Sequence, residues 1–264
     1  MKKTIAIIGA GNLGKSIAKG LLKNENFKAE QLILTRRQPE TLHEFQSLGV
    51  TITSDNRLAA EKADILILGV KPFTVPSILH ELKDILESKR PTVVSLATGV
   101  TLDEISSLTS SDQVIFRAMP NIAADIQESI TCLCSRNETD QQRDEVEDLF
   151  NHIGESISID EALMEAATVL GACGIAYVLR FMRAMIQGGI QIGFDSNTAS
   201  KIVNQTVKGA AELMIRSEMH PEEAIDKVTT PKGCTIVGLN EMEHHGFSSS
   251  MVRGVLASFE KIEK

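Results

Sequence analysis

The chain has 264 residues, of which 42% are hydrophobic and 23% are charged, a composition typical of soluble globular proteins rather than disordered ones. Its net charge of −8, from 27 basic and 35 acidic residues, argues against nucleic-acid binding, which needs a basic surface. With no Trp and one Tyr, the chain also lacks the aromatic platform on which single strands stack.

Membrane insertion and secretion are not expected. The apolar run 4–8 is too short for a signal peptide and leads into a glycine-rich loop. The most apolar later segment, 166–193, is interrupted by Arg180, Arg183 and Gln187. We therefore expect a cytoplasmic protein that makes no use of a membrane.

The first 159 residues alternate short β-rich runs with helical patterns, which is typical of a doubly wound, mostly parallel α/β sheet. Several runs are almost continuously apolar, as strands buried on both faces are. The predicted strands are 4–8, 31–35, 50–53, 65–70, 92–97, 114–118, 129–135 and 156–159. The predicted helices are 12–23, 39–47, 73–86, 102–108 and 141–152.

A glycine motif follows the first predicted strand directly and opens the first predicted helix, the context that dinucleotide-binding loops require. Gly9 permits the tight turn, Gly11 lets the backbone approach a pyrophosphate, and Gly14 lets helix and strand pack closely. Asn12 and Leu13 begin the helix, whose free N–H groups favour phosphate. The alternative is a glycine-rich turn in an unrelated α/β protein.

The second predicted strand ends at Thr35 and is followed by Arg36 and Arg37, without the carboxylate that usually binds the ribose of NAD. Two guanidinium groups suit a 2′-phosphate, so we expect NADPH, with NADH possible. The alternative is a solvated pair of surface charges. Lys71 and Ala97 follow two further strands at the same sheet edge, where ligands of open sheets bind.

Cysteine chemistry and metal binding are not indicated. None of the four cysteines forms a C-x-x-C pair, and no His pair stands near them at ligand spacing. Cys132 and Cys134 lie two apart on a predicted strand, so their side chains share one face. We expect reduced thiols and no metal.

Residues 160–264 carry only helical patterns, at 161–170, 174–192, 197–216, 221–228, 233–245 and 249–262. The sequence therefore predicts a dinucleotide-binding domain over 1–159 and an all-helical domain over 160–264. Small residues are frequent in the helical domain, and a layer of this size buries little apolar area by itself. We expect an isologous homodimer, or a larger assembly of dimers.

The segment around residue 235 suits a carboxylate. Thr230 followed by Pro231 predicts a helix start, with Thr230 as the N-cap. The backbone N–H groups of Gly233 and Cys234, together with the Thr235 hydroxyl, would then be available to an anion. An ordinary capped helix start explains the same residues.

Taken together, these motifs resemble pyrroline-5-carboxylate reductases, the enzymes of the last step of proline synthesis, over nearly the whole chain. The motifs that carry the resemblance are Ile8-Gly9-Ala10-Gly11-Asn12-Leu13-Gly14, Val70-Lys71-Pro72, Ser95-Leu96-Ala97-Thr98-Gly99-Val100, Arg117-Ala118-Met119-Pro120-Asn121 and Thr229-Thr230-Pro231-Lys232-Gly233-Cys234-Thr235. The resemblance implies NAD(P)H-dependent reduction of a cyclic imine carboxylate by a Rossmann domain followed by a helical dimerisation domain.

The resemblance also assigns site residues. Cofactor contacts would come from Asn56, from Val70, Lys71 and Pro72, and from Ala97. The nicotinamide would lie beside Met119, Pro120 and Asn121. Thr230 and Thr235 would lie at the substrate, and Thr235 is the candidate catalytic residue, bonded to the ring nitrogen or to a water.

The chain departs from the family pattern in two places. Residues 171–177 lack two hydroxyl side chains and a proline that the family usually has, and Lys232 stands where a glycine is usual. These departures leave open a paralogue acting on another cyclic imine or a hydroxy acid, or a non-catalytic NADP-binding regulator. Hydroxyacid dehydrogenases place a catalytic lysine in the long interdomain helix, and no lysine lies between residues 160 and 200.

Overall fold

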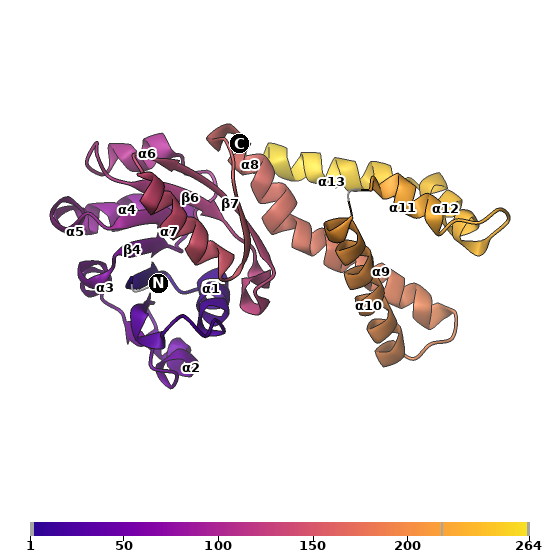
Figure 1. Cartoon of the computed structure of the whole chain (residues 1–264), viewed down its shortest axis with the longest axis horizontal. Helices are drawn as coiled ribbons and strands as arrows, with labels where there is room; N and C mark the ends of the chain where they lie inside the picture. Colours follow the sequence, from indigo (N-terminus) through magenta and orange to yellow (C-terminus); the bar gives the residue numbers. More distant parts are fainter. Residues whose placement is uncertain (1–2, 218, 263–264) are drawn as a thin grey trace. The chain divides into compact units, whose positions relative to one another are not determined.

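The computed structural model describes residues 3–217 and 219–262, which form two compact units (Figure 1). The first comprises 3–172 with 261–262, and the second comprises 173–260. The predicted boundary at 159/160 falls where the sheet ends. The first unit extends further because Met164 belongs to a core on one face of the sheet, with Ala167 and Ala172 packed against that core.

The first unit is built on an eight-stranded sheet with the order β3-β2-β1-β4-β5-β6-β7-β8. All neighbours are parallel except β6 and β7, which confirms the doubly wound, mostly parallel α/β prediction. The strands are β1 Ile5–Ile8, β2 Leu32–Thr35, β3 Thr51–Thr53, β4 Ile65–Leu68, β5 Thr92–Ser95, β6 Ile115–Met119, β7 Ser129–Arg136 and β8 Gly154–Ser158.

Helices cover both faces of this sheet and bury two apolar layers against it, because the strands are apolar on both sides (Figure 1). They are α1 Asn12–Leu22, α2 His43–Gln46, α3 Asn56–Lys62, α4 Val75–Glu81, α5 Lys83–Lys89, α6 Leu102–Ser107, α7 Asp140–Asn151 and α8 Met164–Ala167. Short 3-10 turns are η1 Ala29–Gln31, η2 Pro39–Leu42, η3 Pro72–Thr74, η4 Ile122–Ile126 and η5 Glu161–Leu163.

Two predictions in this unit were wrong. The short polar helix α3 was not predicted, although the Asp55 carboxylate caps it by accepting hydrogen bonds from Arg57 N and Leu58 N at 2.9 and 3.1 Å. The single helix expected over 73–86 is broken at Leu82 into α4 and α5. Leu82 is fully buried, so packing determines where the chain turns.

A continuous helical segment runs from Glu161 to Gln191, where the sequence analysis expected two helices. Its irregular part is the π-helical segment η6, Thr168–Cys173, and α9 follows over Gly174–Gln191. By length and composition alone this segment is able to cross a membrane, and 17% of its most apolar window is buried in the structure. The expectation that the protein makes no use of a membrane therefore stays a prediction.

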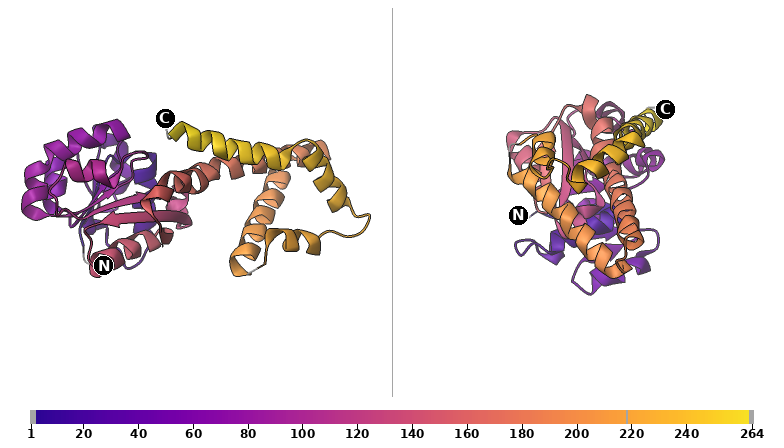
Figure 2. Two further views of the ribbon diagram at one scale, coloured as in Figure 1. Left: turned by 90° about the horizontal axis from the view of Figure 1, so that it is seen from above. Right: turned by 90° about the vertical axis from the view of Figure 1, so that its right-hand side faces the viewer.

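The second unit contains α9 together with α10 Ser196–Arg216, α11 Pro221–Lys227, α12 Cys234–His244 and α13 Phe247–Ile262. Its helices form an open frame rather than a closed bundle (Figure 2). The side chains of Tyr177 and Ser258 join α9 to α13 through a 2.6 Å hydrogen bond, and the rings of Phe181 and Phe247 lie 6.2 Å apart. Gly246 follows the end of α12 with a φ of +76°, the left-handed conformation that commonly ends a helix.

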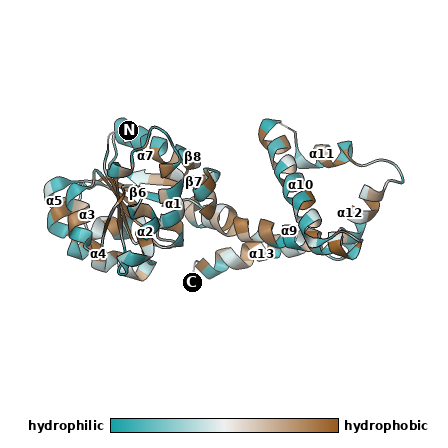
Figure 3. Cartoon of the chain, turned by 90° about the horizontal axis from the view of Figure 1, so that it is seen from below, coloured by the Kyte–Doolittle hydropathy of each residue, from teal (hydrophilic) through white to brown (hydrophobic). Residues whose placement is uncertain are grey.

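The second unit leaves most of its apolar side chains exposed. Among its described residues, only Ala199 and Val203 are buried hydrophobics. Hydrophobic residues recur along α9, α10 and α13 (Figure 3). The exposed large hydrophobics on these three helices are Val178, Leu179, Met185, Ile190, Ile202, Leu213, Ile215, Phe247, Met251, Val252 and Leu256. A unit of this kind has too little core to be stable by itself.

Candidate functional site

The glycine turn after β1 is closely packed at one glycine and open at the next. Gly9 has a φ of +88°, and a Cβ atom there would lie 2.8 Å from the carbonyl oxygen of Gly69. A Cβ atom on Gly11 would approach nothing closer than 4.0 Å, so its backbone faces open space. The turn therefore needs Gly9 for its backbone conformation and Gly11 so that a ligand can approach the backbone. Phosphate-binding loops use glycine in the same two ways.

The end of β2 fixes this turn in place. The backbone N–H groups of Gly9 and Ala10 donate to the Thr35 carbonyl at 3.2 and 2.9 Å. The Thr35 hydroxyl donates to the Asn56 side-chain oxygen at 2.8 Å, which ties the start of α3 to the same strand end. No described side chain caps the first turn of α1, so its N–H groups and the helix dipole are available to an anion.

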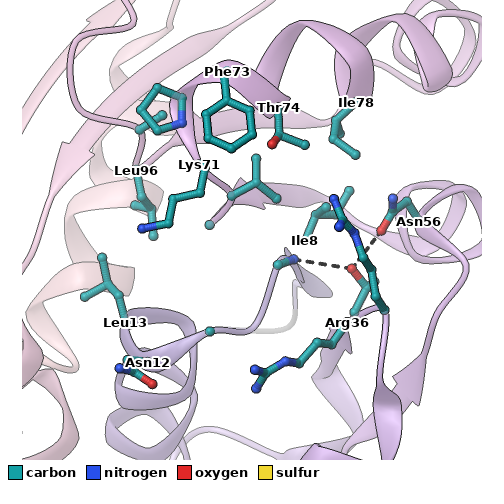
Figure 4. A pocket seen from close by; sticks show the side chains of 18 of the residues that line it. Ile8, Asn12, Leu13, Arg36, Asn56, Lys71, Phe73, Thr74, Ile78 and Leu96 are labelled. Carbon is teal, nitrogen blue, oxygen red and sulfur yellow. Dashed lines mark hydrogen bonds between the residues drawn. The ribbon is translucent and has the colours of Figure 1, made fainter.

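A cleft of about 990 Å³ lies at this edge of the sheet (Figure 4). Arg36, Arg37 and Lys71 line it, and no carboxylate is among its described lining residues, although the whole chain carries a net charge of −8. An elongated cationic cleft beside an open glycine turn fits a dinucleotide with several phosphates.

Most of the predicted cofactor residues meet in this cleft. Those that line it are Gly9, Gly11, Asn12, Leu13, Arg36, Arg37, Asn56, Val70, Lys71, Pro72 and Ala97. Gly14 does not, because it packs against β1, where an added Cβ would lie 3.3 Å from Ile7 Cγ2. The lining residues that the sequence analysis missed are Ile8, Thr35, Gln38, Ser54, Gly69, Phe73, Thr74, Ile78, Leu96 and Thr98. Several of these residues directly follow a predicted strand, and that position in the sequence could have identified them.

Met119, Pro120 and Asn121, expected beside the nicotinamide, are buried and do not line the cleft. The Asn121 side-chain oxygen accepts a 2.9 Å hydrogen bond from Ala123 N, and its Nδ2 donates to the Gly171 carbonyl at 3.1 Å. Gly171 lies in the π-helical segment η6, where carbonyl groups can lose their usual α-helical hydrogen bonds. Asn121 donates a hydrogen bond to one of these carbonyl groups. The role of these three residues toward a cofactor stays a prediction.

Arg117 on β6 is 2% exposed and forms a buried ion-pair network with two glutamates. Its Nη1 lies 3.0 Å from Glu161 Oε1, and its Nη2 lies 2.7 Å from Glu165 Oε1. Burial alone would lower the pKa of Arg117, but the hydrogen bonds to Glu165 and Glu161 outweigh burial and raise it. The network attaches η5 and α8 to the sheet.

The predicted helix start at Thr230 was wrong. The helix α12 begins at Cys234 with Gly233 as its N-cap, and residues 230–233 form a turn closed by a 2.9 Å bond from Gly233 N to the Thr230 carbonyl. Lys232 has a φ of +61°, the left-handed conformation that favours glycine. In this turn the ring of Pro231 fixes its own φ, and Lys232 adopts the left-handed conformation at the next position.

The other predicted substrate residues lie at the start of α12. Cys234 and Thr235 are exposed in its first turn, and no described side chain caps the helix. A Cβ on Gly233 would lie 2.5 Å from the Thr230 hydroxyl and 3.0 Å from the Thr230 carbonyl oxygen, so a larger residue there would have to displace the Thr230 side chain. These residues belong to the second unit, whereas the cleft belongs to the first.

Comparison with known proteins identifies the family. Pyrroline-5-carboxylate reductase 2 of Dictyostelium discoideum is 42% identical over 281 residues, which cover 99% of this chain and 93% of that protein. The chain belongs to the pyrroline-5-carboxylate reductase family. Pyrroline-5-carboxylate reductase 1 of the same organism is 40% identical, and the match spans 97% of this chain but only 49% of that protein.

Family models and a solved structure agree with this assignment. A model described as pyrroline-5-carboxylate reductase dimerisation matches residues 161–264, and one described as NADP oxidoreductase coenzyme F420-dependent matches residues 4–99. The crystal structure of Plasmodium falciparum pyrroline carboxylate reductase with NADP bound is similar, with a TM-score of 0.91 and 27% identity. It covers 99% of this chain and 97% of that one. The helical part of this chain is therefore a dimerisation domain.

Proposed function

We propose that this protein reduces 1-pyrroline-5-carboxylate to L-proline with NADPH. One observation carries the proposal: a cationic cleft beside an open glycine turn, in a chain that belongs to the pyrroline-5-carboxylate reductase family. When bound, NADPH supplies a hydride to the imine carbon. A protonated imine is already electrophilic, so the protein has to supply position rather than strong acid–base catalysis.

The residues of the cleft account for the choice of cofactor. The N-terminal N–H groups of α1 bind the pyrophosphate, and the open backbone at Gly11 lets it approach. Arg36 and Arg37 bind the 2′-phosphate, for which the cleft has charge and no competing carboxylate. NADH lacks that phosphate and is the weaker donor in this proposal.

The turn before α12 is the proposed substrate site. The Gly233 N–H is not available to a ligand, because it closes the turn on the Thr230 carbonyl. The backbone N–H groups of Cys234 and Thr235, in the uncapped first turn of α12, bind the carboxylate, and the Thr230 side chain flanks it. The Thr235 hydroxyl bonds to the ring nitrogen, which makes it the candidate catalytic residue. Lys232 adds a cation beside this carboxylate site, where relatives of the family usually have glycine.

A second copy of this chain is the proposed partner. It covers the exposed apolar side chains of α9, α10 and α13, which one copy leaves in water. Lipid is a poor alternative for α9, because Arg180 and Arg183 would enter the hydrocarbon region with it. We place the enzyme in the cytoplasm, acting on a small imine carboxylate and not on nucleic acid.

The test is NADPH consumption, followed as the loss of its absorbance, with 1-pyrroline-5-carboxylate and with the six-membered imine carboxylate as separate substrates. We expect turnover that is fastest with the five-membered ring and a lower KM for NADPH than for NADH. Tight NADPH binding without turnover of either ring would instead favour a regulatory protein. Turnover of the larger ring alone would favour a paralogue with another substrate.

The role of Thr235 is tested by the Thr235→Ala and Thr235→Ser variants. Thr235 is exposed, so truncation leaves the fold intact, but the loss of one positioned hydrogen bond lowers kcat about 10- to 100-fold. The serine variant retains the hydroxyl and most of the turnover. Unchanged kinetics in Thr235→Ala, with unchanged NADPH binding, would remove Thr235 from the site.

A further inference from the structure

Phe73 is the most exposed large hydrophobic side chain among the described residues, at 84%, and it lines the cofactor cleft. It lies in the 3-10 turn η3, Pro72–Thr74, between the end of β4 and the start of α4. Thr74 N donates to the Lys71 carbonyl at 2.8 Å, and Pro72 presets its own φ, so the backbone that carries the ring is well defined. An exposed aromatic ring on a well-defined turn offers apolar area whose burial by a ligand is favourable.

The neighbours of Phe73 indicate which part of a ligand covers it. Phe73, Thr74 and Ile78 lie along one wall of the cleft, and Arg36 lies on the facing wall (Figure 4). If Arg36 and Arg37 bind a 2′-phosphate, the adenosine half of the dinucleotide occupies the space between these walls.

We propose that the Phe73 ring stacks on the adenine of NADPH and thereby provides a binding residue for the adenosine half. This proposal rests on the proposed function, because it takes NADPH as the ligand. An adenine ring has an apolar π-face and polar edges, so it matches an exposed aromatic ring beside Thr74 and Ile78. Stacking also explains why a cleft rich in cations carries an exposed phenyl ring.

The first experiment measures the dissociation constant of 2′,5′-ADP, which contains only the adenosine half, by calorimetry with the full chain. Phe73→Ala raises this constant, and that of NADPH, about tenfold by loss of one base stack. Phe73→Leu, which retains apolar cover without an aromatic face, also weakens binding, whereas Phe73→Tyr does not. Because Phe73 buries almost nothing, these variants keep the circular dichroism spectrum of the unmodified chain.

The second experiment uses fluorescence, since the chain contains no Trp. Phe73→Trp introduces one indole, and 2′,5′-ADP quenches its emission along a saturation curve that gives the calorimetric dissociation constant. Leu163→Trp is the matched control, because Leu163 is 56% exposed but does not line the cleft. Its emission stays constant when 2′,5′-ADP is added.

The outcomes separate this inference from the proposed function. If the unmodified chain binds neither NADPH nor 2′,5′-ADP, the proposed function itself fails. If it binds both, but Phe73→Ala binds them equally well, the stacking proposal is overturned and the proposed function stands. Equal affinity of Phe73→Leu and the unmodified chain, or an unquenched Phe73→Trp, overturns stacking in the same way.

Discussion

Arg36 and Arg37 give the cleft a positive local charge, although the chain as a whole is negatively charged. They follow β2 directly, and the fold brings them into a cleft that Lys71 also lines. The Arg36 side chain is positioned in part by the glycine turn, because its Nη1 donates to the Ala10 carbonyl at 3.4 Å. A chain of net charge −8 thus presents a local cationic surface where an anionic cofactor is expected.

We expect Arg36→Ala and Arg37→Ala each to weaken NADPH binding about 10- to 100-fold, since a charge-assisted hydrogen bond contributes roughly 1.5–3 kcal/mol. NADH is the matched control ligand, because it lacks the 2′-phosphate and its binding changes little. Titration of both cofactors against each variant measures the difference. Equal losses for NADH and NADPH would contradict the assignment of these two residues to the 2′-phosphate.

Cys134 provides a prediction about pH. Burial raises the pKa of this thiol to about 11, from an ordinary value of 9.0, while the nearby Arg117 charge acts in the opposite direction. The folded state therefore holds this proton more tightly than the unfolded state does. The resulting stabilisation is complete below pH 9 and is lost as the pH rises from 9 through 11, by about 3 kcal/mol in all.

Urea unfolding at several values between pH 8 and pH 11 measures this loss. The Cys134→Ala variant removes the thiol, so its unfolding free energy falls less steeply over the same interval, even though the cavity makes it less stable at neutral pH. Cys234, which is exposed, gives the control variant Cys234→Ala with an unchanged slope. Identical slopes for Cys134→Ala and the unmodified chain would refute the prediction.

At the scale of elements, the contact between α1 and η4 determines where the loop after β6 lies. Gly20 on α1 permits this contact, because an added Cβ would lie only 2.1 Å from the Ala124 carbonyl oxygen and 2.9 Å from Ile153 Cγ2. The Lys23–Asp125 ion pair, at 3.3 Å, joins the same two elements near their exposed ends. A glycine that would merely weaken an isolated helix is therefore required here by packing.

Gly20→Ala is expected to destabilise the protein by about 1–3 kcal/mol, since overpacking outweighs the gain in helix propensity. Gly238 in α12 is the matched control, because a Cβ there would meet no atom within 4 Å. Gly238→Ala is expected to be neutral or stabilising by up to about 1 kcal/mol. Urea unfolding measures the free energy of unfolding of both variants. Equal values for the two would contradict the prediction, because α1 and η4 could then move apart without loss of stability.

At the scale of the whole molecule, the two units differ in how much of their stability a single copy supplies. The first has a core on each face of its sheet, whereas the second buries only Ala199 and Val203 among its described hydrophobics. The family places a dimerisation domain over this region. We therefore expect a second copy to supply the burial that the second unit lacks.

The double variant Val252→Asp, Leu256→Asp tests this on α13, where the two side chains are 58% and 54% exposed and lie one helical turn apart. We expect light scattering to show a dimer or larger assembly for the unmodified chain and a monomer for the double variant. Ser249→Asp adds a charge to an exposed position of the same helix and leaves the assembly intact. A monomeric unmodified chain at micromolar concentration would exclude the dimer.

The sequence by itself was enough to predict the features that depend on residues close together in the chain. Each of the eight described strands was predicted from a short β-rich run, and the glycine turn was predicted from its position after β1. Both predictions succeeded because strand propensity and backbone conformation depend on consecutive residues. The helix α3 and the turn before α12 were missed, since one is short and polar and the other depends on a left-handed Lys232.

Only the tertiary structure decided which side chains meet in the cleft. Phe73, Ser54 and Thr98 are far apart in the sequence, and they line one cavity because strand order β3-β2-β1-β4-β5 brings their strand ends to a single edge. That order follows from pairing between distant segments, which no local pattern records. The cofactor class could therefore be predicted from the sequence, whereas the cleft wall that carries Phe73, Thr74 and Ile78 could be recognised only in the assembled sheet.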